Sequence, residues 1–189
     1  MRKHFLSFGN HFHVLAIIGI LFLSGCSSHV YPGLLFDNAK GSERKQLEKF
    51  MEAGVEKKID AHKTNAAKII KTARKFLGVP HCMGGTTSKC MDCSGLLVTA
   101  FAENGISIPR SSEEQARYGI LIAEIDQLKK GDMVFFIRSY NTHRFITHSG
   151  IYVGDNHFIH ASSSRGVTIT PLSNPWWNKK FIFGTRVFE

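Results

Sequence analysis

The chain has 189 residues and a formal net charge of +9, with 24 Lys and Arg against 15 Asp and Glu. An excess of this size favours non-specific attraction to an anionic polymer or a lipid surface, without identifying which. The sequence has no motif of a nucleic-acid-binding module, so we expect no nucleic-acid partner.

The first 25 residues have the form of a secretory signal. Arg2 and Lys3 precede an apolar run of ten residues, 14–23, whereas a membrane-spanning helix needs roughly 20. The run meets the sequence LSGC, which resembles a bacterial lipobox, in which the cysteine becomes the first mature residue and carries lipid. We therefore predict a signal peptide over 1–25, a lipidated Cys26 and attachment to a membrane of the bacterial cell envelope.

Removal of residues 1–25 lowers the formal charge from +9 to +7, because this segment contains two basic residues and no acidic one. The residue after Cys26 is Ser27, and not the aspartate that is associated with retention in the inner membrane. We therefore expect the outer membrane as the location where the cell has one. Residues 26–41 show little periodicity and include Pro32, which indicates a tether after the anchor.

Two amphipathic helices are predicted next. Residues 42–58 place Leu47, Phe50 and Val55 at helical spacing among charged residues. A second helix is predicted from Asn65 to Leu77, ended by Gly-Val-Pro at 78–80. We divide the mature chain into the tether (26–41), an N-terminal helical segment (42–62) and one further domain (63–189), since roughly 160 residues suit a single core.

The second half of the chain carries short β-like runs. They are residues 132–137, 146–154, 157–162, 167–172 and 181–188. Their closeness in sequence predicts an antiparallel meander, because parallel neighbours need long crossover connections. Helices followed by strands indicate the α+β class.

A cysteine stands where a third helix is predicted to begin. In DCSGLLVTAFAENG, Asp92 can cap a helix that starts at Cys93, and Asn-Gly at 104–105 can close it. Leu97 and Ala100 share a face with Cys93, so we expect the thiol to lie on the packed side. The positive end of the helix dipole favours the thiolate, while the charge of Asp92 opposes it.

A cysteine nucleophile needs a base, and the base needs a group that orients it. His148 and His160 lie in neighbouring predicted strands. A two-residue loop between these strands would put the two side chains on opposite faces, and a three-residue loop over 155–157 would put them on one face. The catalytic interpretation therefore predicts the three-residue loop, with Tyr152 opposite His160 and His157 in the turn.

Five motifs in order are similar to those of the NlpC/P60 family of cell-wall cysteine peptidases: DCSGLL, IPRSSEEQ, GDMVFF, THSGIYVG and FIHASSSRGV. The resemblance covers about residues 65–188. It implies a papain-like α+β fold, with a helix bearing the cysteine packed on an antiparallel sheet. It also implies Cys93 as nucleophile, His148 as general base and His160 as the group that orients His148, with no metal or organic cofactor.

The implied reaction is hydrolysis of amide bonds in the stem peptides of peptidoglycan. Relatives cut either between D-glutamate and the diamino acid, or at a cross-link that involves the diamino acid. Asp92, Ser94 and Arg110 stand at positions that resemble groove residues of the family, where a helix cap, a first-turn hydroxyl and a buried ion pair are the structural alternatives. We expect a monomer.

One departure from the family pattern concerns the groove. Many relatives have a tyrosine beside the catalytic cysteine, and His81 occupies that position here. An imidazole can still donate a hydrogen bond to a substrate, and it titrates near neutral pH. The aromatic residue that follows in relatives is also missing, since Cys82 and Met83 come next.

Three other interpretations remain open at this level. Cys90 and Cys93 form a C-x-x-C pair that could bind zinc with Cys82 or a histidine, although the second half of such a site is absent. Alternatively, Cys82 and Cys90 could form a disulfide, which is compatible with catalysis by Cys93. The protein could also be a non-catalytic envelope protein that keeps the fold and only binds wall peptides.

Overall fold

The computed structural model describes residues 39–61 and 64–188. The predicted signal peptide (1–25), the predicted lipid-bearing Cys26 and the tether up to residue 38 lie outside the described residues. Within the described ranges, no helix is long and apolar enough to cross a membrane.

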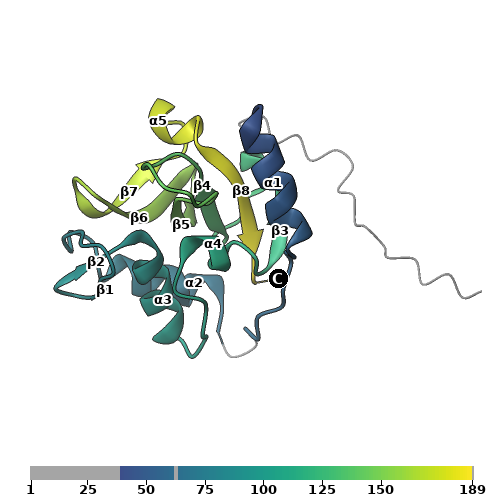
Figure 1. Ribbon diagram of the computed structural model, residues 1–189. Coiled ribbons are helices and arrows are strands. Elements are labelled where there is room, and N and C mark those ends of the chain that lie inside the picture. Colours follow the sequence, from purple (N-terminus) through teal and green to yellow (C-terminus); the bar gives the residue numbers. More distant parts are fainter. Residues whose placement is uncertain (1–38, 62–63, 189) are drawn as a thin grey trace, which may run out of the picture. The chain divides into compact units, whose positions relative to one another are not determined.

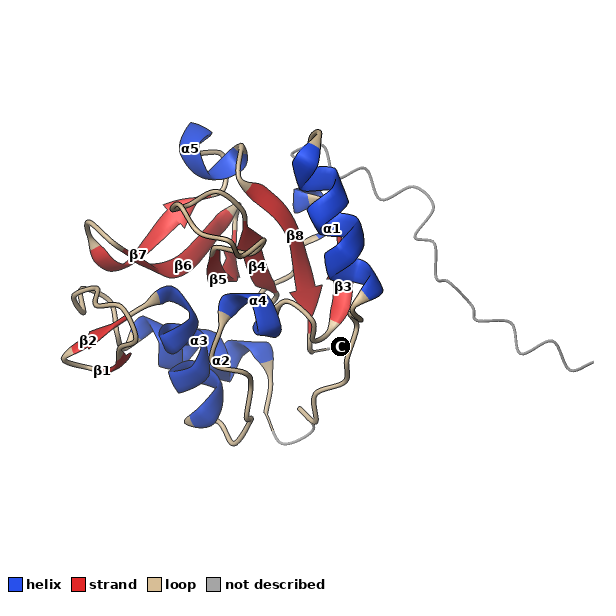
Figure 2. Cartoon of the chain, viewed as in Figure 1, coloured by secondary structure: helices blue, strands red, loops and turns tan. Residues whose placement is uncertain are grey.

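Among the described residues, the longer helices precede the strands of the main sheet in sequence (Figures 1 and 2). The helices are α1 (Ser42–Glu52), α2 (Ala66–Arg74), α3 (Cys93–Ala102), α4 (Ser112–Gln115), the 3-10 helix η1 (Ile125–Gln127) and α5 (Pro175–Asn178). The strands are β1 (Thr86–Thr87), β2 (Cys90–Met91), β3 (Ile120–Ile122), β4 (Met133–Phe136), β5 (His148–Gly154), β6 (His157–Ser162), β7 (Gly166–Pro171) and β8 (Phe181–Arg186).

In the described chain, six strands form one antiparallel sheet in the order β3-β8-β4-β5-β6-β7. Strands β4 to β7 follow one another as a meander, as the sequence predicts. The last strand departs from a simple meander, because β8 returns to pair with β4 and carries β3 on its outer edge. The α+β class is confirmed.

Both N-terminal helices end earlier than the sequence analysis predicts. Helix α1 stops at Glu52 instead of continuing to residue 58, because Gly54 turns the chain with a φ of 96°. Helix α2 is capped by Asn65, whose side chain accepts a hydrogen bond from the Lys68 amide at 3.1 Å. It ends at Arg74 instead of Leu77, and the following residues form a tighter turn with i→i−3 hydrogen bonds.

The main hydrophobic core lies between the helices and one face of the sheet. Helix α3 packs on β5 and β6 and lies beside α2 (Figure 1). Leu47 and Phe50 of α1 join the same core, and so does Ala39 from the end of the predicted tether. A second cluster packs on strands β4, β5 and β6 together with Trp177 of α5.

The β5–β6 hairpin corrects one prediction and confirms its consequence. Its turn has two residues, Asp155 and Asn156, both with positive φ (51° and 60°), so the three-residue loop over 155–157 is wrong. Tyr152 pairs with Phe158 and not with His160, because a bulge at Val153 shifts the register. The bulge supplies the extra residue that the catalytic interpretation assigned to the loop. His148 and His160 therefore still share a face.

Candidate active site

The thiol of Cys93 lies at the first residue of α3, as the sequence predicts. Asp92 caps the helix, and its Oδ1 accepts a hydrogen bond from the Gly95 amide at 2.7 Å. Leu97 and Ala100 on the same face are fully buried. Cys93 itself is partly exposed and lines a cavity of about 650 Å³. The Cys93 thiol therefore combines a fixed backbone with access from solvent.

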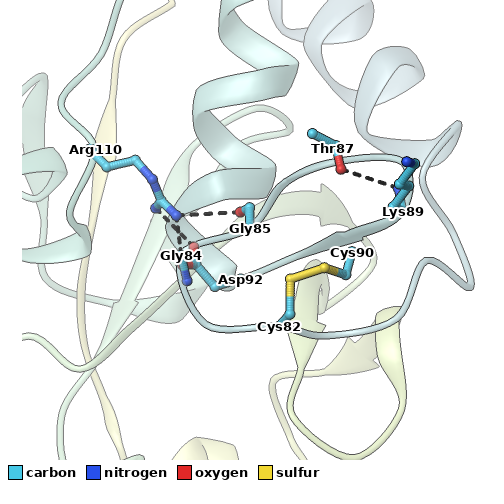
Figure 3. The surroundings of a disulfide bond; sticks show 8 residues. All are labelled: Cys82, Gly84, Gly85, Thr87, Lys89, Cys90, Asp92 and Arg110. Carbon is cyan, nitrogen blue, oxygen red and sulfur yellow. Dashed lines mark hydrogen bonds and ion pairs between the residues drawn. A yellow bond between two sulfur atoms is a disulfide. The ribbon is translucent and has the colours of Figure 1, made fainter.

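Asp92 does more than cap the helix. Arg110 donates two parallel hydrogen bonds to its carboxylate, at 2.9 Å and 2.7 Å, and the Gly84 amide donates a third at 2.7 Å (Figure 3). Ser94 Oγ donates to Asp92 and accepts from Arg110. Burial would raise the pKa of Asp92, but these hydrogen bonds and the charge of Arg110 outweigh it, so the pKa is lowered.

The three predicted groove residues thus form one network beside the thiol. Asp92, Ser94 and Arg110 all line the cavity that contains Cys93. The ion pair is not fully buried, since the Arg110 side chain is 43% exposed while that of Asp92 is 9% exposed. Asp92 therefore caps α3 and pairs with Arg110 while both side chains still line the cavity.

A disulfide between Cys82 and Cys90 holds the loop before α3 (Figure 3). The sequence analysis left this disulfide open, and its presence means that Cys90 is not free to pair with Cys93 as a metal-binding thiolate. Within the loop, a Cβ at Gly85 would meet the Cys82 sulfur and lie 2.6 Å from the Cys90 carbonyl oxygen. Only glycine fits there, so this loop is packed directly under the disulfide.

His81 precedes this loop and lines the same cavity as Cys93. Its backbone bridges to Met91, which follows the disulfide residue Cys90. His81, at the position where the resemblance places a tyrosine, therefore shares a cavity with Cys93.

A hydrogen-bond network that the sequence analysis did not identify contacts the thiol. Cys93 Sγ lies 3.5 Å from Ser112 Oγ, and Ser112 Oγ lies 2.9 Å from Ser149 Oγ. Ser149 donates to Gln115 Oε1 at 3.3 Å, while Gln115 Nε2 donates to the carbonyl oxygens of Ser94 and Pro109. The buried Gln115 therefore connects α3, α4 and β5 around the Cys93 thiol.

The surroundings of Cys93 favour the protonated thiol at rest. Burial raises its pKa above the ordinary value, and the charge of Asp92 acts in the same direction. Hydrogen bonds from Ser112 and from the Ser149 and Ser94 backbones lower the pKa but do not outweigh burial. These donors can instead stabilise the thiolate when it forms during reaction.

The two histidines form a hydrogen-bonded pair. His148 Nε2 lies 2.9 Å from His160 Nδ1, and His160 Nε2 lies 3.0 Å from Thr170 Oγ1. We assign the protons from this network: His148 Nε2–H donates to His160, and His160 Nε2–H donates to Thr170. The Nδ1 atom of His148 then keeps its lone pair and is available to accept a proton.

Aromatic rings surround the imidazole pair. Trp177 lies 4.6 Å from His148 and 4.7 Å from His160 between ring centroids, and Phe158 lies 4.5 Å from His160. Burial lowers the pKa of His148 to about 3, and the charge of Asp92 acts in the opposite direction without outweighing burial. The pKa of His160 is also lowered, by burial and then by the charges of His148 and Arg165. Both rings are therefore neutral at pH 7.

The cavity brings Cys93 and His148 together, and the contact between the imidazoles adds His160. His157 opens β6 and is not among the lining residues. Sequence reasoning missed Ser112, Gln115, Ser149, Thr170 and Trp177. Ser112 and Gln115 lie in the motif IPRSSEEQ and Ser149 lies in THSGIYVG, so the motifs pointed to these segments without revealing the contacts of each residue.

The model of the NlpC/P60 family matches residues 78–186 of the chain. This range contains Cys93, His148, His160 and the hydrogen-bond network around them.

Several known proteins are similar to this chain. The "Probable endopeptidase NlpC homolog" of Haemophilus influenzae is 35% identical over 146 residues, 75% of each chain. The "Murein DD-endopeptidase MepS/Murein LD-carboxypeptidase" of Escherichia coli K12 is 38% identical over 65% of this chain and 63% of its own length. A crystal structure of an NlpC/P60 family protein from Bacillus cereus superposes with a TM-score of 0.61 at 33% identity, covering 67% of this chain and 41% of that one.

Proposed function

This chain belongs to the NlpC/P60 family, and we propose that it is a peptidoglycan endopeptidase that cleaves wall stem peptides or cross-links with Cys93 as nucleophile. The main support for the proposal is the arrangement of Cys93, His148 and His160 in the site. A partly exposed thiol at a helix start shares a cavity with His148, and a second imidazole fixes the tautomer of His148. The relatives named as endopeptidases support the choice of reaction and substrate.

In the first step, His148 Nδ1 accepts the thiol proton as Cys93 Sγ attacks the carbonyl carbon of the substrate. The reaction does not start from a stable ion pair, because burial favours both the protonated thiol and the neutral imidazole. His160 accepts a hydrogen bond from Nε2–H of His148 and so stabilises the imidazolium that forms. Thr170 in turn keeps His160 in the accepting tautomer.

The remaining steps complete hydrolysis. The Cys93 backbone amide lies in the first turn of α3, where a helix leaves its N–H groups unpaired, and it can donate to the oxyanion. Protonated His148 then gives its proton to the leaving amine, which breaks the C–N bond and leaves a thioester on Cys93. Water, deprotonated by His148, attacks the thioester and releases the acid and the free thiol.

The experiment is digestion of purified peptidoglycan and defined muropeptides, with products identified by mass spectrometry. Wild-type protein is expected to release fragments whose masses identify the bond that is cut, and Cys93→Ala is expected to release none. Binding of the polymer without cleavage by either protein would instead favour a non-catalytic wall-binding protein.

We also propose that the protein is a monomer carried on a membrane of the cell envelope by lipid on Cys26, in the outer membrane where one is present. The lipid anchor is supported by the basic, apolar and LSGC segments of the first 26 residues. Mass spectrometry of the N-terminal peptide from the native host tests it. A lipid-modified cysteine as the first residue is expected, and an unmodified chain that still begins at Met1 would contradict it.

A further inference from the structure

The direction of the reaction assigns one side of the cavity to the leaving group. The imidazole of His148 must reach the nitrogen that departs, because it delivers the proton that this nitrogen needs. The part of the substrate that contains the leaving amine therefore lies on the imidazole side of Cys93. Residues that contact the direct neighbours of the His148–His160 pair, Trp177 and Thr170, and also line the cavity are candidates to bind it.

Trp176 satisfies both conditions. It is 48% exposed although it is a large apolar residue, and it lines the cavity that contains Cys93. Its ring lies 4.5 Å from that of Trp177, which lies 4.6 Å from His148. Trp176 is thus within about 9 Å of the imidazole, a distance that about three extended residues span at about 3.3 Å each.

Neighbouring groups hold the Trp176 ring in place. The ammonium group of Lys180 lies over it, 4.4 Å from the centroid, and donates a hydrogen bond to the Arg138 carbonyl oxygen at 3.0 Å. The backbone amide of Trp176 donates to Asn174, which caps α5. Lys180 is not among the residues that line the cavity, so it supports the ring from outside. A fixed, exposed ring gives the methylene groups of a ligand a flat apolar surface.

Arg165, in the turn between β6 and β7, is the second candidate. It lines the same cavity, and its Nη2 donates to Thr170 Oγ1, the group that accepts from His160, at 3.4 Å. Across residues 39–61 and 64–188, no carboxylate forms a salt bridge with Arg165. Its guanidinium keeps several donors for an anion, in the planar arrangement that suits a carboxylate.

The other arginines of the cavity are less available. Arg110 is committed to the carboxylate of Asp92 through two hydrogen bonds. The charge of Arg144 interacts with the carboxylate of Glu113 on α4, opposing the burial that raises the pKa of that carboxylate. Arg165 is therefore the lining cation best placed to accept a new anion on the imidazole side.

We propose that Trp176 and Arg165 form the subsite for the leaving-group half of the substrate, a diamino acid whose second carboxylate is free, such as diaminopimelate. Its methylene chain lies on Trp176 and its free carboxylate binds Arg165. This inference rests on the proposed function. The subsite would serve cleavage at the bond between D-glutamate and the diamino acid and also cleavage at the cross-link. In both cases the leaving amine belongs to the diamino acid.

The test compares three peptides with the same acyl half, in which the diamino acid is diaminopimelate, its carboxamide, or lysine. Wild-type kcat/KM is expected to be about tenfold higher for the free carboxylate, as expected for one charge-assisted hydrogen-bond pair. Arg165→Gln should bring the three values within about twofold of one another by lowering only the first. Arg74→Gln, an exposed arginine of α2 outside the cavity, removes the same charge and should keep the preference.

Trp176→Ala should raise KM for all three peptides by about tenfold, since it removes apolar contact common to them, and Trp176→Phe should restore most of the loss. The control Ile120→Ala removes another exposed apolar side chain, at the sheet edge, and should change nothing. Equal loss on all three peptides in Arg165→Gln would overturn the proposal, because Arg165 would then act through Thr170 on His160. Equal wild-type values for acid and amide would overturn it too.

Binding separates this proposal from the proposed function. If the wild-type protein cleaves none of the peptides, the endopeptidase assignment fails. Calorimetry on Cys93→Ala, with and without Arg165→Gln, then decides the subsite alone. Tighter binding of the acid than of the amide, lost with Arg165→Gln, supports the subsite, and equal or absent binding overturns it.

Discussion

Burial of the imidazole pair makes the stability of the protein depend on pH below the ordinary pKa of histidine. His148 is 7% exposed, and its pKa is about 3 in the folded protein, against 6.5 for a free histidine. A histidine with a lowered folded-state pKa stabilises the fold above pH 6.5. That contribution is lost as the pH falls, because the unfolded chain binds the proton and the folded chain does not.

The size of the effect follows from the two pKa values. Between pH 7.5 and pH 5.0, His148 alone should lower the free energy of unfolding by about 2 kcal/mol, at about 1.4 kcal/mol for each pH unit below 6.5. His160 acts in the same direction, since its pKa is also lowered. The variant His148→Gln removes the titrating group and keeps a side-chain N–H that can donate to His160.

The assay is urea denaturation followed by tryptophan fluorescence at pH 7.5 and 5.0, for wild type and His148→Gln. The contributions of groups that the substitution does not affect cancel in the comparison. Wild type should lose about 2 kcal/mol more than the variant between the two pH values. An equal loss in both proteins would refute the reasoning, because His148 would then titrate normally in the folded state.

Three further changes test the network around the site. Thr170→Val removes the acceptor for the second imidazole and should lower kcat about fivefold to tenfold with little change in KM; an effect confined to KM would contradict its positioning role. Asp92→Ala removes the helix cap and leaves Arg110 unpaired, so unfolding should become about 2–3 kcal/mol easier in urea, whereas a loss below about 0.5 kcal/mol would contradict that structural role. Replacing Cys82 and Cys90 together by alanine opens a loop with a sequence separation of 8 and should cost about 2–3 kcal/mol, read as a lower Tm; an unchanged Tm would contradict it.

Local signals in the sequence were sufficient to place Cys93 at the start of α3 and to locate most strands. Asp92 followed by an apolar face places the start of α3 at Cys93, because capping and burial depend on residues within one or two turns. Strand β6 matches the predicted range 157–162, because turn-forming residues bound its apolar run on both sides.

Long-range contacts could not be read in the same way. The bulge at Val153 depends on how β5 pairs with β6, so the correct relation between the histidines was predicted with the wrong turn. Nothing near Ser149 in sequence indicates that it contacts Ser112 and Gln115, since the fold brings these segments together. Trp177 likewise follows a short loop after β7, and only the tertiary structure packs it on His148.

Alkylation of Cys93 tests the central claim most directly. The protein is treated with iodoacetamide for increasing times, the alkylated fraction of Cys93 is measured by peptide mass mapping, and the rate of muropeptide hydrolysis is measured on the same samples. Because Cys93 is the free thiol among the described cysteines, the account predicts that activity falls in proportion to its alkylation and reaches zero when alkylation is complete. Undiminished hydrolysis by fully alkylated protein would show that Cys93 is not the nucleophile.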